Sequence, residues 1–150
     1  MHSKKFKYQE YLSKFSNCPP IEYCEKSQSV FRWVFVECDK NSFKPVLILE
    51  PARQLADDDK SCEGYALSMF EMQEGAYSKY KKLVRNKPQL KKNFGTIIAE
   101  INLSIEDGIC SNPEVKNYSH FNLHEYEGTD LSKKVVNIID IFDENGNFKK

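Results

Sequence analysis

The chain has 150 residues, with 22 Lys plus Arg, 22 Asp plus Glu and a formal net charge of zero. This length suffices for one domain with a core of its own, and the balanced charge argues against a histone-like basic protein and an acidic disordered tail. Aromatic residues make up 13% of the chain, which argues against disorder.

The cysteines and the N-terminal stretch predict a cytoplasmic protein. Five cysteines are scattered along the chain without any C-x-x-C motif, which is typical of reduced thiols rather than of a disulfide framework or a thiolate zinc site. The N-terminal stretch carries a charge every few positions, unlike a signal peptide. No apolar run approaches the ~20 residues that span a bilayer. We therefore expect no membrane segment, no metal and no cofactor.

The first predicted element is a helix over about residues 6–16. Apolar side chains recur there at helical spacing and form one stripe, which consists of Tyr8, Tyr11, Leu12 and Phe15. The consecutive prolines at 19 and 20 end this helix, since proline lacks the amide hydrogen and disfavours helix in the residue before it.

Two strands are expected next. Residues 29–38 combine β-branched and aromatic side chains on both faces, which predicts a central strand covered on both sides. After a turn at 39–41, residues 45–50 predict a second strand, and the two strands can form a hairpin. Residues 56–60 are charged and predict a solvated loop.

The second long helix is predicted over 72–86, where Met72, Ala76, Tyr80 and Leu83 form one apolar stripe. The sequence from Ser68 to Glu71 matches a capping box at the start of such a helix. Alternating apolar residues predict strands over 95–104 and 118–126. Residues 135–142 fit either element, because their apolar spacing suits a helix whereas their β-branched residues favour a strand; we expect a strand after a short helical turn near 130. Residues 143–150 are expected to form a frayed tail.

This order of elements predicts an α+β fold in a single domain spanning 1–150. We expect a mostly antiparallel sheet of about five strands with two main helices packed on it.

A run of basic residues is the first candidate for a functional surface. Seven positive charges and no acid lie between residues 79 and 92, in a chain whose net charge is zero. Such a surface can neutralise phosphates or contact an acidic protein, although lysines on a solvated helix face are also common. The candidate binding residues are Lys79, Lys81, Lys82, Arg85 and Lys87.

The histidines are the second candidate. His120 and His124 share one face of the strand predicted over 118–126, roughly 13 Å apart at the usual rise per residue, which is too far to chelate one metal. Either imidazole can act as a general base near neutral pH, but polar histidines on a half-exposed strand are the simpler interpretation. The third histidine, His2, lies at the N-terminus.

Arg32 is the third candidate, because it shares a strand face with valines. A guanidinium is almost never buried without an anionic partner. We expect an internal ion pair with Glu50 or Glu100, and the alternative partner is a phosphate or carboxylate of a ligand.

One combination of residues resembles a known family. Arg32, Ser68 and the Glu-x-Glu segment at 125–127 follow the order in which one class of ADP-ribosyltransferases places Arg, Ser and Glu-x-Glu on successive strands. The Ser-Thr-Ser pattern of that class is absent. The resemblance implies that Arg32 binds the phosphates of a nicotinamide dinucleotide, that Ser68 supports its ribose pocket and that Glu127 is the catalytic carboxylate.

Three functions follow as hypotheses. The leading one is a small binding module that presents the basic helix to nucleic acid or to an acidic protein surface. The second is a small enzyme acting on a phosphate-containing substrate, in which Arg32 binds the anion and His120, His124 or Glu127 carries the chemistry. The third is a stoichiometric inhibitor or immunity-type protein, for which aromatic residues serve as interface anchors.

Overall fold

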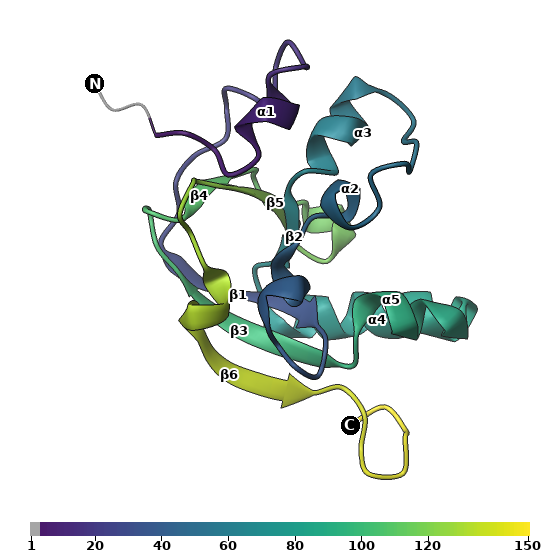
Figure 1. Ribbon diagram of the computed structural model, residues 1–150. Helices are drawn as coiled ribbons and strands as arrows, with labels where there is room; N and C mark the ends of the chain where they lie inside the picture. The colour runs from purple at the N-terminus through teal and green to yellow at the C-terminus, as the bar shows by residue number, and fades with distance from the viewer. Residues whose placement is uncertain (1–3) are drawn as a thin grey trace.

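Six antiparallel strands form one sheet in the order β4-β5-β2-β1-β3-β6 (Figure 1). The computed structural model describes residues 4–150, so His2 lies outside the described residues. The strands are β1 Gln28–Val34, β2 Leu67–Phe70, β3 Ile97–Leu103, β4 Gly108–Cys110, β5 His120–Glu125 and β6 Val135–Asp140. The α+β class and the antiparallel sheet are confirmed, with six strands rather than about five. The central place predicted for β1 is also confirmed, because it lies between β2 and β3.

One helix is long and the others are short. Helix α4 spans Gln73–Asn86, close to the range predicted. The other helices are α1 Gln9–Leu12, α2 Val46–Leu49, α3 Asp58–Glu63 and α5 Lys91–Phe94, with 3-10 turns η1 Lys40–Phe43, η2 Pro88–Leu90, η3 Val115–Asn117 and η4 Leu131–Lys134. None of the helices in residues 4–150 has the length and apolar character needed to cross a membrane.

The core lies on both faces of the sheet. Helix α4 packs Ala76, Tyr80 and Val84 against one face, where they meet Phe70 and Ile98. The other face carries the larger cluster, which includes side chains of β1, β2, β3 and β5 together with residues of η1 and η4. The strands therefore have apolar side chains on both faces, as β1 was predicted to have.

The sheet opens between β1 and β2. These strands share a single paired position, Phe31 opposite Phe70, whereas β1 and β3 are paired along the full length of β1. Figure 1 accordingly shows β4, β5 and β2 above β1, β3 and β6. Beyond Phe31 and Phe70, the end of β1 and the start of β2 are not joined by ladder hydrogen bonds. This opening positions the candidate site described below.

The N-terminal helix is much shorter than the predicted 6–16. Helix α1 has four residues, and Tyr8 at its start offers no side-chain cap. Phe6 instead forms a β-bridge with Tyr126, and the Lys7 amide donates to the Glu125 carbonyl at 2.9 Å, so this segment pairs with the end of β5 rather than extending the helix. Leu12 is buried as predicted, while Tyr11 stacks on Tyr65 with ring centroids 5.2 Å apart.

The predicted strand over 45–50 and its hairpin are wrong. This segment contains α2, which starts after the extended residue Pro45. The Leu47 amide donates to the Gly64 carbonyl at 3.0 Å, and Leu47 lies so close to Gly64 that a β-carbon there would clash with it. The expected loop over 56–60 is also partly helical, because Asp57 caps α3 by accepting from the Lys60 amide at 2.8 Å.

The capping box predicted at Ser68 is absent. Ser68 lies in β2 opposite Asn122 of β5, so pairing of these strands replaces the helix start. The residue before α4 is Met72, which has no side-chain cap and is 54% exposed. The predicted stripe therefore holds at Ala76 and Tyr80 but not at Met72.

The C-terminal prediction is confirmed for the strand and wrong for the tail. Turn η4 precedes β6, as expected near residue 130. The tail, however, folds back on itself, because Phe142 and Phe148 form a β-bridge and the Lys149 amide donates to the Ile141 carbonyl at 2.9 Å. Phe148 also packs edge-on against Tyr80, which explains why this segment is held against the fold.

Candidate functional site

Arg32 spans the opening between β1 and β2. Its Nε donates to the Ser42 carbonyl at 2.9 Å, and its Nη1 donates to the Ser68 carbonyl at 2.8 Å. A guanidinium has more N–H donors than these two bonds use. Arg32 therefore closes the gap in the sheet with backbone contacts and retains donors for a further partner.

The internal ion pair expected for Arg32 is absent from residues 4–150. Glu50 pairs instead with Arg53, at 3.5 Å between Nη1 and Oε2. Glu100 lies opposite Phe31 in the β1–β3 ladder. Directly opposed residues share a face of the sheet, so Glu100 faces away from Arg32. The predicted carboxylate partners were wrong for this reason.

A pocket of about 510 Å³ lies at the opening, and Arg32 is part of its lining. This volume is within the ~300–1,000 Å³ range of ligand pockets. The pocket combines aromatic and basic side chains from β1, β2, η1 and the segment around α5. Its aromatic lining residues are Trp33, Phe35, Phe70 and Phe94, its basic lining residues are Arg32, Lys44, Arg53 and Lys92, and its acidic lining residues are Glu50 and Glu63.

The charge of Arg32 is maintained in this environment. Burial lowers the pKa of the guanidinium to about 10, and the negative charge of Glu125 acts in the opposite direction. The side chain is therefore cationic at neutral pH. A partly buried cation without a hydrogen-bonded carboxylate attracts an anion more strongly than a fully solvated one does, because water screens it less.

Trp33 forms a fixed wall of the pocket. Its Nε1 donates to the Ala76 carbonyl at 2.8 Å, which ties the indole to α4. The ring lies 4.6 Å from Phe94 and 5.1 Å from Phe70 between centroids. These contacts hold the indole in one orientation, on the face of β1 opposite to that of Arg32, so the two side chains line the pocket from different sides of the sheet.

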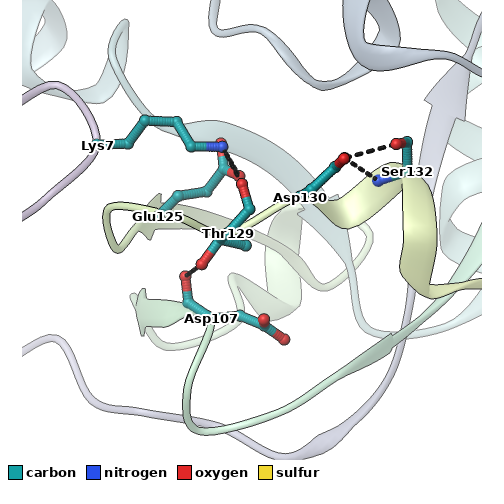
Figure 2. A network of polar contacts seen from close by, with 6 residues as sticks. All are labelled: Lys7, Asp107, Glu125, Thr129, Asp130 and Ser132. Carbon is teal, nitrogen blue, oxygen red and sulfur yellow. Dashed lines mark hydrogen bonds and ion pairs between the residues drawn. The ribbon is translucent and has the colours of Figure 1, made fainter.

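The Glu-x-Glu segment divides between the interior and the surface. Glu125 ends β5, is 3% exposed and pairs with Lys7 at 2.8 Å through Oε2 (Figure 2). Its Oε1 has no hydrogen-bond partner among the described residues. Burial raises the pKa of Glu125, while the charges of Lys7 and Arg32 lower it. Glu127 is exposed beyond the strand end, and its amide donates to the Lys5 carbonyl at 2.8 Å.

The polar contacts around Glu125 hold the end of β5 in place. Lys7 also donates to the Thr129 carbonyl, and the Thr129 hydroxyl donates to the Asp107 carbonyl at 3.1 Å (Figure 2). Asp107 pairs with Lys134 at 2.7 Å through its carboxylate. Since each member bonds to another part of the chain, this network has a structural role that accounts for the buried charges.

The two histidines do not join Arg32. His120 shares a face with Phe70 and Phe31, because the three are opposed across the ladders, and that face is opposite to the face of Arg32. Its Nδ1 lies 3.3 Å from Glu114, and burial lowers its pKa. His124 is 1% exposed and lies beside Cys62. The residues proposed for acid–base chemistry are thus not assembled around one pocket.

The expectation of five reduced thiols is wrong for two of the cysteines. Cys18 and Cys62 form a disulfide across 44 residues, with their Cα atoms 5.7 Å apart. The fold brings the proline-containing segment after α1 beside α3, and neither cysteine lies in a recognisable motif. Spacing in the sequence therefore gave no signal for this pair. Cys24, Cys38 and Cys110 are free thiols.

The basic residues of 79–92 form a second candidate surface. Lys81, Lys82 and Arg85 lie on α4 away from the buried Ala76 and Tyr80, as predicted. None of the seven cations in 79–92 pairs with an acid in the part of the chain that is described. Several contact uncharged groups instead. Lys79 donates a hydrogen bond to the Asn117 side chain. Three others lie over aromatic rings in cation–π contacts: Lys81 over Tyr77, Lys82 over Tyr118 and Arg85 over Phe148. Lys87, just beyond the helix, is exposed.

Sequence patterns identified Arg32 and Ser68 but not the aromatic part of the pocket. Trp33 and Phe35 were interpreted as core residues because they alternate on an apolar strand. Phe94 follows a lysine run and carries no pattern of its own. Comparisons of the chain with protein-family models, curated proteins and solved structures gave no match.

Proposed function

We propose that this protein binds a nucleotide-type ligand in the pocket between β1 and β2. The observation that carries the proposal is the charged Arg32, which has backbone carbonyls but no carboxylate as partners and lines a pocket with aromatic walls. The cytoplasmic location expected from the sequence stays a prediction that rests on the N-terminal stretch alone, since the Cys18–Cys62 disulfide removes the argument from reduced thiols.

The chemistry of the lining supports a ligand with both a phosphate and a planar ring. Arginine presents a fork of donors that matches phosphate oxygens and forms strong, charge-assisted hydrogen bonds. Lys44 and Lys92 add positive charge to the same pocket. The indole of Trp33 and the ring of Phe94 offer surfaces on which a base or nicotinamide ring can stack.

The resemblance to ADP-ribosyltransferases agrees with two of these features. Arg32 and Ser68 come from neighbouring strands and are joined by a hydrogen bond at the pocket. Glu127, which the resemblance implies as the catalytic carboxylate, is not among the pocket residues. We therefore limit the proposal to binding and do not extend it to transfer of ADP-ribose.

Isothermal titration calorimetry with ADP-ribose, NAD and adenosine tests the proposal. We expect ADP-ribose and NAD to bind the wild-type protein, and adenosine to bind at least ~10-fold more weakly because it lacks phosphate. Arg32→Gln should reduce the affinity for ADP-ribose by ~10-fold or more. Arg53→Gln is the matched control, since Arg53 also lines the pocket but is paired with Glu50.

Because Arg32 contacts two backbone carbonyls, its variants need a folding control. Thermal unfolding is measured for each variant, and Arg32→Lys retains the charge while removing the fork. The proposal fails if no phosphate-bearing compound binds the wild type, or if folded Arg32→Gln binds ADP-ribose as tightly as the wild type does.

The basic helix supports a second candidate function, which is contact with an extended anion. The cations of 79–92 have no acidic partner in residues 4–150, and Lys92 belongs to both this surface and the pocket. Single-stranded nucleic acid suits this arrangement better than an acidic protein does, because the pocket offers stacking surfaces for a base. An inhibitor or immunity function stays a prediction from size and aromatic content.

A further inference from the structure

A compact cluster of sulfur and nitrogen atoms lies apart from the residues used above. Cys18 comes from the segment after α1, Cys62 from α3 and His124 from β5. Their sulfur and imidazole nitrogen atoms all lie within 4.8 Å of one another. Cys62 and His124 are buried, and Cys18 is partly exposed. Soft thiolates and an imidazole are the ligands that zinc prefers in proteins.

The spacing of these atoms matches a tetrahedral metal site. With zinc–sulfur and zinc–nitrogen bonds of about 2.3 and 2.0 Å, two ligand atoms of such a site lie about 3.5–3.8 Å apart. Cys62 Sγ and His124 Nε2 are already 3.7 Å apart. The two sulfur atoms, which are bonded to each other here, would have to separate, with the Cys18 sulfur, now within 4.8 Å of the His124 nitrogen, taking the third position.

The backbone permits this separation. The Cα atoms of Cys18 and Cys62 are 5.7 Å apart, so rotation of the two side chains can separate the sulfur atoms without moving α3 or the segment after α1. His124 is held in position by the β4–β5 ladder, where it lies opposite Ile109, and by the ring of Tyr23, whose centroid is 5.8 Å away. Its Nε2 faces Cys62 Sγ, and no carboxylate within residues 4–150 forms a hydrogen bond or ion pair with this nitrogen.

We propose that reduction of the Cys18–Cys62 disulfide creates a binding site for one zinc ion, held by two thiolates and the His124 imidazole. A dithiol reductant supplies two electrons and two protons, so the disulfide becomes two thiols and the reductant becomes a disulfide. Zinc then replaces the two thiol protons, which pass to solvent. Three protein ligands leave the fourth position for water. The site does not depend on the proposed nucleotide binding.

Cobalt titration of the full chain tests the site, because Co²⁺ replaces zinc and absorbs visibly when bound to thiolates. After reduction with a dithiol under anaerobic conditions, we expect one equivalent of Co²⁺ to bind with thiolate charge-transfer absorption. The oxidised protein should bind none. Cys62→Ser and His124→Gln should each lose this absorption, whereas the control Cys24→Ser, which alters an exposed free thiol, should retain it.

A further variant separates loss of a ligand from loss of the fold. His124→Cys supplies a third thiolate at the same position, so it should restore Co²⁺ binding with stronger charge-transfer absorption. Circular dichroism confirms that each variant is folded. The proposal is overturned if the reduced wild type binds no Co²⁺, if the oxidised protein binds it equally well, or if folded Cys62→Ser and His124→Gln bind it unchanged.

Discussion

At the scale of single residues, Arg32 is the feature whose surroundings are hardest to explain without a ligand. Removing a guanidinium from water costs several kcal/mol, which a carboxylate usually offsets. Here the carbonyls of Ser42 and Ser68 accept its hydrogen bonds. The Ser42 hydroxyl also accepts a hydrogen bond from the Phe35 amide at 3.0 Å. Ser42 therefore holds both the end of β1 and the Arg32 guanidinium. The geometry of Arg32 is thus set before any anion arrives, which reduces the entropic cost of binding.

A prediction at this scale concerns His120. Burial lowers its pKa below the ordinary value of 6.5, with Glu114 acting in the opposite direction. The unfolded chain therefore binds the proton more tightly than the folded protein does. The stability that this histidine contributes is present above pH 6.5 and is lost as the pH falls through its lower folded-state pKa.

Denaturant unfolding of wild type and His120→Gln from pH 7.5 down to pH 5 measures this effect. The difference in unfolding free energy between the two proteins should change in favour of His120→Gln as the pH falls. Other titrating groups cancel in the difference, because both proteins contain them. Parallel stability curves over this range would contradict the assignment.

At the scale of elements, periodicity predicted those segments whose surroundings are uniform. Helix α4 and strands β3 and β5 each have a regular apolar pattern, and each was placed within a few residues, whereas β6 was placed by its β-branched residues because its apolar spacing also suits a helix. The segment 45–50 has apolar residues at every position from Val46 to Leu49, which suits either a strand or a helix. Packing of Leu47 against Gly64 favours the helix, and this contact between residues distant in the sequence cannot be predicted from the local pattern.

In the candidate site, too, local sequence predicted one part and tertiary structure determines the rest. Arg32 was identified because a charge on an apolar strand needs a partner, and this rule requires only local sequence. The pocket, in contrast, depends on β1 and β2 separating after one paired position, which is a property of the whole sheet. The Cys18–Cys62 disulfide joins residues 44 positions apart, so it too is set by tertiary structure.

The prediction for α4 concerns its unpaired cations. The double variant Lys81→Glu with Arg85→Glu should weaken binding to single-stranded DNA by ~10-fold or more at low salt and flatten the salt dependence. Fluorescence anisotropy of a labelled oligonucleotide at several salt concentrations measures both quantities. The matched control is Lys5→Glu with Lys133→Glu, which changes the net charge equally at exposed positions elsewhere.

Binding that is equal in these two double variants would mean that overall charge, rather than the α4 surface, governs the interaction. If the wild type does not bind DNA but binds an acidic polypeptide in a salt-dependent manner, then the partner of this surface is a protein.

At the scale of the whole molecule, the zero net charge conceals a separation of charges. Basic residues gather along 79–92 and around the Arg32 pocket, while Glu125 and Asp107 lie buried with lysine partners. The sheet opens where the basic and aromatic side chains meet. The total charge of the chain gives no indication of this local arrangement, on which the proposed binding of an anion with a planar ring rests.

The most direct test of the Arg32 pocket uses its own tryptophan. Trp33 is the only tryptophan in the chain, and it lines this pocket. Titration with ADP-ribose should quench or shift its fluorescence with saturation, and Arg32→Gln should move the midpoint to at least ~10-fold higher concentration. A fluorescence spectrum that stays unchanged at every ADP-ribose concentration, in a folded wild-type protein, would contradict binding at this pocket.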